Sequence, residues 1–196
     1  MEPLIYLASE SPRRRQLLEQ IGVPFEPVQQ DVEETMEQGE SPEVFVLRLA
    51  LDKARAGLAN VDPARRLPVL GADTVVVLDD RAMGKPEDQA DGEEMLASLS
   101  GVSHRVLTGV ALVDGEREAT RISVNTVTLR EISAAERAAY WRSGEPRGKA
   151  GGYAIQGRGA VFVEHLEGSY SGVMGLPLFE TADMLEEFEI DYQAQW

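Results

Sequence analysis

Two long β-prone runs flank the dipeptide Asp114-Gly115, and this pattern constrains the fold more than any other in the chain. Residues 104–113 and 117–129 are rich in valine, leucine and threonine, and Asp-Gly is a preferred turn between antiparallel strands. A third run, 68–78, is equally β-prone, although we expect residues 71–74 to interrupt it. A sheet must therefore dominate the middle of the chain, and any helices must pack on its faces.

Helices are expected before and after these strands. Ser11-Pro12 and Ser41-Pro42 each place a capping serine before a proline at the first helical position. Helices are predicted over 12–22, 42–60, 87–99, 133–142 and 177–188, and further strands over 4–9, 24–30 and 160–166. The pattern favours an α/β fold with an elongated mixed sheet. Without a repeat or linker, residues 1–196 are interpreted as a single domain.

Composition excludes several classes of function. The 34 acidic residues against 19 basic ones give a formal charge of −15, which argues against binding to nucleic acid or an anionic membrane. No run approaches the roughly 18 apolar residues of a membrane span, so we expect a soluble, cytoplasmic protein. The absence of cysteine excludes disulfides and thiolate metal sites. With only two histidines, any metal is expected to be Mg²⁺ or Mn²⁺ held by oxygen.

The end of the first predicted strand carries an anion-binding signal. Ser9 and Ser11 supply hydroxyls there, and the following helix opens with Arg13, Arg14 and Arg15. A helix N-terminus has free N–H donors and favours a negative charge, so three cations at this point are unfavourable unless an anion binds. The alternative is a solvated basic first turn.

Lysine is rare in this chain, and each lysine has a distinctive setting. Lys53 ends a long helical run, Lys85 lies in Gly-Lys-Pro, and Lys149 lies in a glycine-rich stretch. An ammonium group is a compact point charge suited to phosphate, whereas arginine is a rigid fork. The pattern indicates phosphate contacts, with chance as the alternative.

One aspartate lies within an aliphatic run. Asp73 is surrounded by the residues of Val69–Val77, and a buried carboxylate must be paired or bound to metal. It could activate water or hold a divalent cation, or it could simply accept backbone hydrogen bonds at a strand bulge. Glu34, in the acidic loop 31–40, becomes a candidate only as the partner of Asp73.

Three other glycine-rich stretches fail as motifs. Residues 144–150 lack the spacing of a P-loop, and 157–159 lack the third glycine of a dinucleotide fingerprint. Residues 168–172 carry tyrosine where a nucleophile elbow needs serine. Hydrolysis or phosphoryl chemistry by metal-activated water is what remains.

Taken together, these residues closely resemble the Maf family of nucleoside triphosphate pyrophosphatases. The resemblance runs from about residue 4 to 188. The matching segments are Ser9–Arg14, Gly71–Thr74, Gly84–Pro86, Leu99–Gly101, His104, Thr108-Gly109, Gly148–Gly157, Tyr170-Ser171 and Val173–Leu178.

The resemblance implies a fold similar to that of inosine triphosphate pyrophosphatases, with two lobes around a central cleft, in a homodimer. It implies cleavage of a nucleoside triphosphate between the α- and β-phosphates, with a divalent metal cation. The proton acceptor falls on Asp73, with Glu34 and Lys85 as further catalytic groups and both carboxylates as candidate metal ligands. The implied substrate-binding residues are Ser9, Arg13, Arg14, Lys53, Thr74, Lys149 and Gln156.

The resemblance also extends to the residues that differ between substrate subgroups of the family. Arg13, Thr74 and Gln156 match the subgroup that prefers dTTP and UTP over 7-methyl-GTP. Two rival interpretations stay open, namely a septation regulator that acts through protein contacts and a hydrolase of purine triphosphates. Which of Asp73 and Glu34 is the base, and which the metal ligand, is also open at this point.

Overall fold

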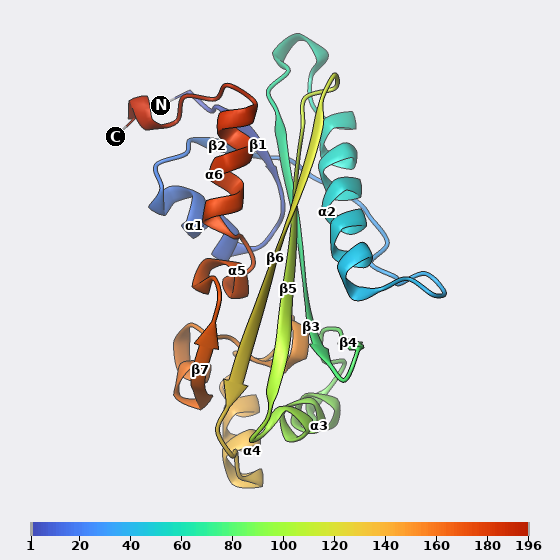
Figure 1. The fold of residues 1–196 in the computed structure, drawn as a ribbon, viewed down its shortest axis with the longest axis vertical. Coiled ribbons are helices and arrows are strands. Elements are labelled where there is room, and N and C mark those ends of the chain that lie inside the picture. The colour runs from blue at the N-terminus through green and yellow to red at the C-terminus, as the bar shows by residue number, and fades with distance from the viewer. Residues whose placement is uncertain (1, 196) are drawn as a thin grey trace.

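A seven-stranded mixed sheet forms the backbone of the molecule in the computed structural model, which describes residues 2–195 (Figure 1). The strand order is β2-β1-β3-β5-β6-β7, and β4 pairs with β3. β1 is parallel to β2 and β3, whereas the remaining pairs are antiparallel. The strands are β1 (Ile5–Ala8), β2 (Phe25–Pro27), β3 (Val69–Leu78), β4 (Arg81–Met83), β5 (Ser103–Val113), β6 (Glu118–Leu129) and β7 (Val163–Glu167).

Helices cover the sheet unevenly along its length. α2 crosses the upper half of one face, and α1 and α6 lie on the opposite side of that half (Figure 1). α3 and α4 gather around the lower end. The helices are α1 (Pro12–Gln20), α2 (Pro42–Ala59), α3 (Gln89–Leu99), α4 (Ala134–Arg142), α5 (Tyr170–Met174) and α6 (Leu178–Glu187), with 3₁₀ turns at Pro63–Arg65, Ala150–Gly152, Gly157–Phe162 and Gln193–Gln195. No helix of the described residues is long and apolar enough to cross a membrane.

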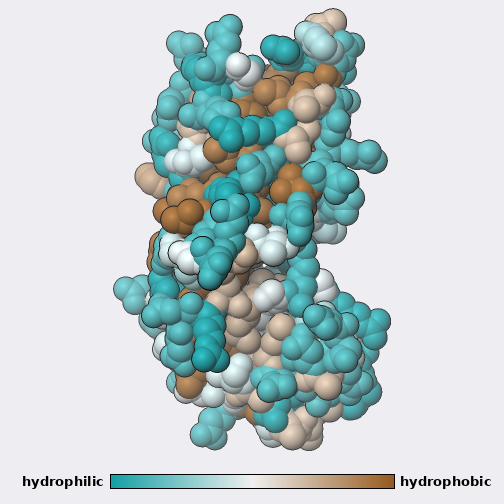
Figure 2. Space-filling view, turned by 90° about the vertical axis from the view of Figure 1, so that its right-hand side faces the viewer, coloured by the Kyte–Doolittle hydropathy of each residue, from teal (hydrophilic) through white to brown (hydrophobic). Residues whose placement is uncertain are grey.

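The core is divided between an upper and a lower lobe. Ile5, Leu18 and Met184 belong to the cluster beneath α1 and α6, whereas Leu96 and Phe162 belong to the lower cluster. β3, β5 and β6 run through both lobes, and Figure 2 shows the outline narrowing between them. The predicted fold class, a mixed sheet with flanking helices and two lobes, is confirmed.

Several local predictions were wrong. Residues 71–74 do not interrupt β3, because each pairs with a residue of β5, as Asp73 does with Gly109. The predicted strand 160–166 begins only at Val163, since 157–162 wind into a 3₁₀ turn. Ser11 occupies the N-cap of α1, yet its side chain makes no capping hydrogen bond. β4 and α5 were not predicted.

Two glycines allow α2 to lie unusually close to the sheet. A Cβ atom at Gly71 would lie 2.2 Å from the carbonyl oxygen of Ala50, and one at Gly109 would lie 2.4 Å from that of Val46. Real Cβ atoms essentially never come this close to another atom, so any larger residue at either position would force α2 to shift. The close approach brings the side chains of α2 directly onto the centre of β3.

Candidate active site

A cleft of about 910 Å³ opens between the two lobes. Its walls come from the β1–α1 connection, α2, β3, the segment after β4, the glycine-rich loop 144–157 and α5. Every site residue predicted from the sequence lines this cleft: Ser9, Arg13, Arg14, Glu34, Lys53, Asp73, Thr74, Lys85, Lys149 and Gln156. The structure therefore brings the whole predicted set together, although the role of each member stays a proposal.

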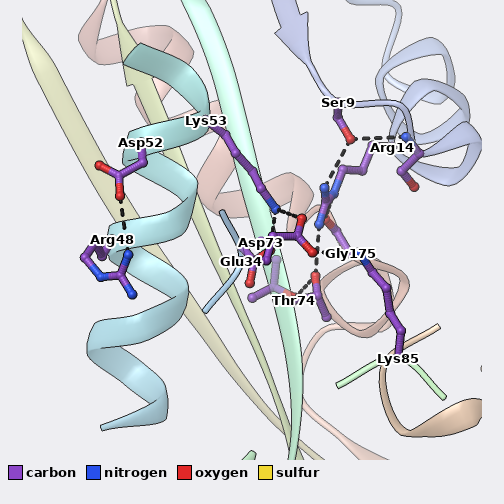
Figure 3. Close-up of polar contacts among 12 residues, drawn as sticks. Ser9, Arg14, Glu34, Arg48, Asp52, Lys53, Asp73, Thr74, Lys85 and Gly175 are labelled. Atoms are coloured by element: carbon purple, nitrogen blue, oxygen red, sulfur yellow. Dashed lines mark hydrogen bonds and ion pairs between the residues drawn. The ribbon is translucent and has the colours of Figure 1, made fainter. Parts of the chain in front are cut away.

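A buried lysine joins the two candidate carboxylates. The Lys53 Nζ atom, on α2, donates hydrogen bonds to Asp73 Oδ1 and to Glu34 Oε1, both at 2.6 Å (Figure 3). Lys85 Nζ donates to the other oxygen of Glu34 at 2.7 Å. Lys53 is 3% exposed and Asp73 7% exposed, so this cluster lies at the floor of the cleft. The predicted partnership of Glu34 with Asp73 thus runs through a shared ammonium group.

Charge strongly perturbs the acidity of Glu34. Burial alone would raise the pKa of this carboxyl, but the hydrogen bonds from Lys53 and Lys85 outweigh burial and lower the pKa to about 2. Glu34 is therefore an anion at neutral pH, and a carboxylate of so low a pKa is a weak proton acceptor.

Arg14 is built into the wall of the cleft. Its Nε atom donates to the carbonyl of Gly175 at 2.7 Å, Nη1 to Ser9 Oγ at 3.1 Å, and Nη2 to Thr74 Oγ1 at 3.3 Å (Figure 3). Burial lowers the pKa of this guanidinium, and the negative charge of Asp73 opposes that change. A guanidinium has five N–H donors, so two of them are left for a ligand.

Strand alternation separates the two halves of the site. Asp73 faces α2, whereas Thr74 points to the opposite face, where α1 and α5 pack. There Thr74 Oγ1 lies 2.9 Å from Thr108 Oγ1, and Thr108 donates to the carbonyl of Gly172 at 2.8 Å. Neighbouring residues of β3 therefore serve the carboxylate cluster and the Arg14 network, respectively.

The glycine-rich loop is closed by a carboxylate that the sequence interpretation missed. Glu145 accepts hydrogen bonds from the backbone N–H groups of Arg158 and Gly159, both at 2.9 Å, and from the Tyr140 hydroxyl at 2.8 Å. Lys149 Nζ donates to the carbonyl of Glu145. In the sequence, Glu145 precedes the segment Gly148–Gly157 that resembles the family, and no local pattern distinguishes it from a solvated glutamate.

Lys149 and Gln156 of this loop and Arg13 of α1 line the cleft. Burial, followed by the charge of Arg13, lowers the pKa of Lys149, and burial lowers that of Arg13. The Arg13 Nε and Gln156 Oε1 atoms are buried with no hydrogen-bond partner among the described residues. Unpaired polar atoms are costly inside a protein, so both are candidates for contact with a ligand.

The two carboxylates suit a cation that enters the cleft bound to a phosphate ligand, because they are too few to form a complete metal site by themselves. Within residues 2–195 no group of three or more histidine, aspartate or glutamate side chains could hold a metal ion. Mg²⁺ needs only one or two carboxylates when waters and substrate phosphates complete its shell. Asp73 and Glu34, linked through Lys53, provide such a pair.

Comparisons with known proteins agree with this geometry. The family model described as "Maf-like protein" matches residues 4–188. The chain is 66% identical to the dTTP/UTP pyrophosphatase of Alkalilimnicola ehrlichii, over 99% of this chain and 97% of that one. It is 56% identical to the Saccharophagus degradans protein of the same name, over 95% and 89% of the two chains. The corresponding protein of Xanthomonas campestris pv. campestris is 54% identical over 94% and 98%.

Among solved structures, the Ham1 protein of Staphylococcus aureus matches with a TM-score of 0.45 and 19% identity, over 81% of this chain and 79% of that one. The family assignment rests instead on the sequence matches, which extend over nearly the whole chain. By those matches, the chain belongs to the Maf-like protein family.

Proposed function

We propose that this protein hydrolyses dTTP and UTP, and related modified uridine triphosphates, to the nucleoside monophosphate and pyrophosphate. The observation that carries the proposal is the buried Asp73–Lys53–Glu34 cluster at the floor of a cleft lined by further cations. The names of the relatives, dTTP/UTP pyrophosphatase, support the same substrates.

Cations on three sides of the cleft would bind the triphosphate. Arg13 and Lys149 face it from α1 and the glycine-rich loop, and Lys85 faces it from the segment after β4. Arg14 contributes its two remaining donors, and Ser9 a hydroxyl. Burial lowers the pKa of Arg13 and of Lys149 because it disfavours their charged forms, so an anion bound between them would stabilise both cations.

The reaction requires a proton acceptor close to the α-phosphate. We assign this role to Asp73, which lies at the floor of the cleft, because Glu34, with a pKa of about 2, is a weak proton acceptor. Water attacks the α-phosphorus and its proton passes to Asp73, while the bond from the α-phosphorus to the bridging oxygen breaks and pyrophosphate leaves. Lys53 and Lys85 would neutralise charge that develops on the leaving group.

A divalent cation, Mg²⁺ or Mn²⁺, belongs to this proposal. Asp73 and Glu34 would hold it together with phosphate oxygens of the substrate. When bound, such a cation neutralises phosphate charge and lowers the pKa of bound water. The Lys53 ammonium would then turn from the two carboxylates towards the phosphates.

Base choice is assigned to Gln156. Its buried Oε1 atom lacks a partner among the described residues, and an amide can both donate and accept. This combination suits the O4 and N3–H groups of thymine or uracil. Thr74 acts indirectly in this scheme, because its hydroxyl contacts Arg14 and Thr108.

The deciding experiment is a panel of nucleoside triphosphates incubated with purified protein and Mg²⁺, with the products identified by chromatography. We expect pyrophosphate and monophosphate from dTTP and UTP, at a higher kcat/KM than from purine triphosphates. Orthophosphate with a diphosphate as first products would contradict the proposed bond. A best rate with 7-methyl-GTP or ATP would contradict the proposed base, and no hydrolysis at all would favour the septation-regulator alternative.

Two further aspects of the proposal concern context. The substrates are cytoplasmic metabolites, so we place the protein in the cytoplasm. The homodimer implied by the resemblance is tested by light scattering of the purified chain.

A further inference from the structure

We propose that Arg48, a residue outside the cleft, is a positioning residue that holds the loop bearing Glu34 against α2. The inference rests on the proposed function, since it concerns the geometry of the same carboxylate cluster. Arg48 is not one of the described residues that line the cleft, and its hydrogen bonds lead to the site through the acidic loop 31–40.

Arg48 grips this loop at two points. Its Nε and Nη2 atoms donate to the two carboxylate oxygens of Glu40 at 2.7 and 2.8 Å, which is the paired geometry in which arginine binds a carboxylate best. Nη2 also donates to the backbone carbonyl of Thr35 at 3.0 Å. Thr35 directly follows Glu34, so the second contact fixes the main chain beside the site residue.

Further contacts hold the Glu40 carboxylate and the Arg48 guanidinium in place. The Glu40 side chain is only 6% exposed and also accepts a hydrogen bond from the backbone N–H of Glu37 at 3.0 Å. On the other side, Arg48 Nη1 lies 3.5 Å from Asp52 Oδ2, one turn further along α2 (Figure 3). The guanidinium is thus held by its own helix while it holds the loop.

The segment that carries Glu34 has no regular secondary structure and packs on the core through two partly buried side chains, Val32 and Met36. Residues 28–41 contain no helix or strand, only a turn at 38–39. The side chain of Glu34 is bonded to Lys53 and Lys85, the ammonium groups that we expect to turn towards phosphate in the complex. The contacts of Arg48 do not depend on those lysines, so they persist when the lysines move.

Arg48 and Lys53 share one helix, which explains how the spacing is fixed. Lys53 contacts Asp73 and Glu34 from α2, and Arg48 anchors the neighbouring backbone from a position five residues earlier. α2 itself is fixed by its close approach to β3 at Gly71. One rigid element therefore sets the positions of both carboxylates.

The same helix offers a matched control. Arg55 donates to both oxygens of Glu118 at 2.8 and 2.6 Å, the same paired geometry, but Glu118 lies at the start of β6. Neither Arg55 nor Glu118 is among the described residues that line the cleft. Arg55→Gln removes an ion pair of the same geometry, but a more exposed one, from α2 without touching the acidic loop.

The experiment compares Arg48→Gln, Arg48→Lys and Glu40→Gln with Arg55→Gln by steady-state kinetics on dTTP and by hydrogen exchange of residues 31–40. We expect kcat/KM to fall about 10–100-fold in the first three variants, mostly in kcat, because a misplacement near 1 Å costs about 100-fold. Lysine should not rescue, since it cannot span both Glu40 oxygens and the Thr35 carbonyl. Exchange in 31–40 should accelerate in these variants alone.

Two outcomes overturn the inference. Unchanged exchange of the acidic loop in Arg48→Gln would show that the contacts do not hold it. Full activity of Arg48→Gln, or of Arg48→Lys, would show that the grip is not needed or that charge alone suffices. An inactive wild-type protein would contradict the proposed function instead, and hydrogen exchange would still test the grip.

Discussion

At the scale of single residues, the site is organised around one buried ammonium group. Lys53 is bonded to both carboxylates, so neither Asp73 nor Glu34 is an uncompensated charge in the free protein. A buried carboxylate without a partner would be strongly destabilising. The cluster is therefore compensated in charge before any ligand binds, and its side chains are already in position.

Replacing the proposed base separates chemistry from folding. Asp73→Asn keeps the shape of the side chain and can still contact Lys53 through its carbonyl oxygen. We expect kcat to fall about 10²–10⁴-fold, the usual effect of losing a general base. Circular dichroism checks that the fold is intact. Glu34→Gln is the companion variant, and a larger loss there than in Asp73→Asn would reverse the assignment of base and ligand.

The sequence identified these residues better than it identified their roles. Local patterns indicated Asp73, the arginines of α1 and the three lysines, whereas Thr74 and Gln156 were found only through the resemblance to one family. The contacts of Arg14 and Thr74 were not foreseen, since a contact such as Arg14 to Gly175 joins segments 161 residues apart. Likewise, Arg48 and Glu40 read as ordinary charges of a helix and a loop until the fold brings them together.

At the scale of elements, prediction succeeded where the hydrophobic pattern is long. The β5–β6 hairpin and α2 were predicted within a few residues, because the hydrophobic pattern of each element repeats over ten or more residues. β4 and α5 span three and five residues, too few to show a period. β3 was expected to break at Gly71–Thr74, but that glycine serves the packing of α2 rather than a turn.

The packing of α2 on β3 can be tested by adding one methyl group. Gly71→Ala would place a Cβ 2.2 Å from the Ala50 carbonyl oxygen, so the helix must shift. We expect a loss of about 1–3 kcal/mol in the free energy of unfolding, the usual effect of overpacking. Because the shift also moves Lys53, kcat should fall. Gly84→Ala, where a Cβ meets nothing within 4 Å, is the control for stability in denaturant titrations.

At the scale of the whole molecule, the two lobes share their strands. β3, β5 and β6 each contribute to both hydrophobic clusters, with Leu70 of β3 in the upper one and Val76 in the lower one. The cleft therefore lies over continuous strands rather than over a flexible linker. This arrangement keeps cations of both lobes, such as Arg13 on α1 and Lys149 beside the lower cluster, at fixed distances from Asp73 on the shared strand β3.

Shared strands also determine how the molecule should unfold. We propose that residues 1–196 form one domain, because neither lobe can lose its strands without disrupting the other. Thermal unfolding should then be a single transition with equal calorimetric and van 't Hoff enthalpies.

A second test follows each lobe separately. Trp196→Phe leaves Trp141, which lies on α4 in the lower lobe, as the only tryptophan, and its fluorescence reports that lobe. Far-UV circular dichroism includes α2 of the upper lobe. The two signals should change at the same temperature, whereas a fluorescence transition separated from the dichroism transition would mean that the lobes fold independently.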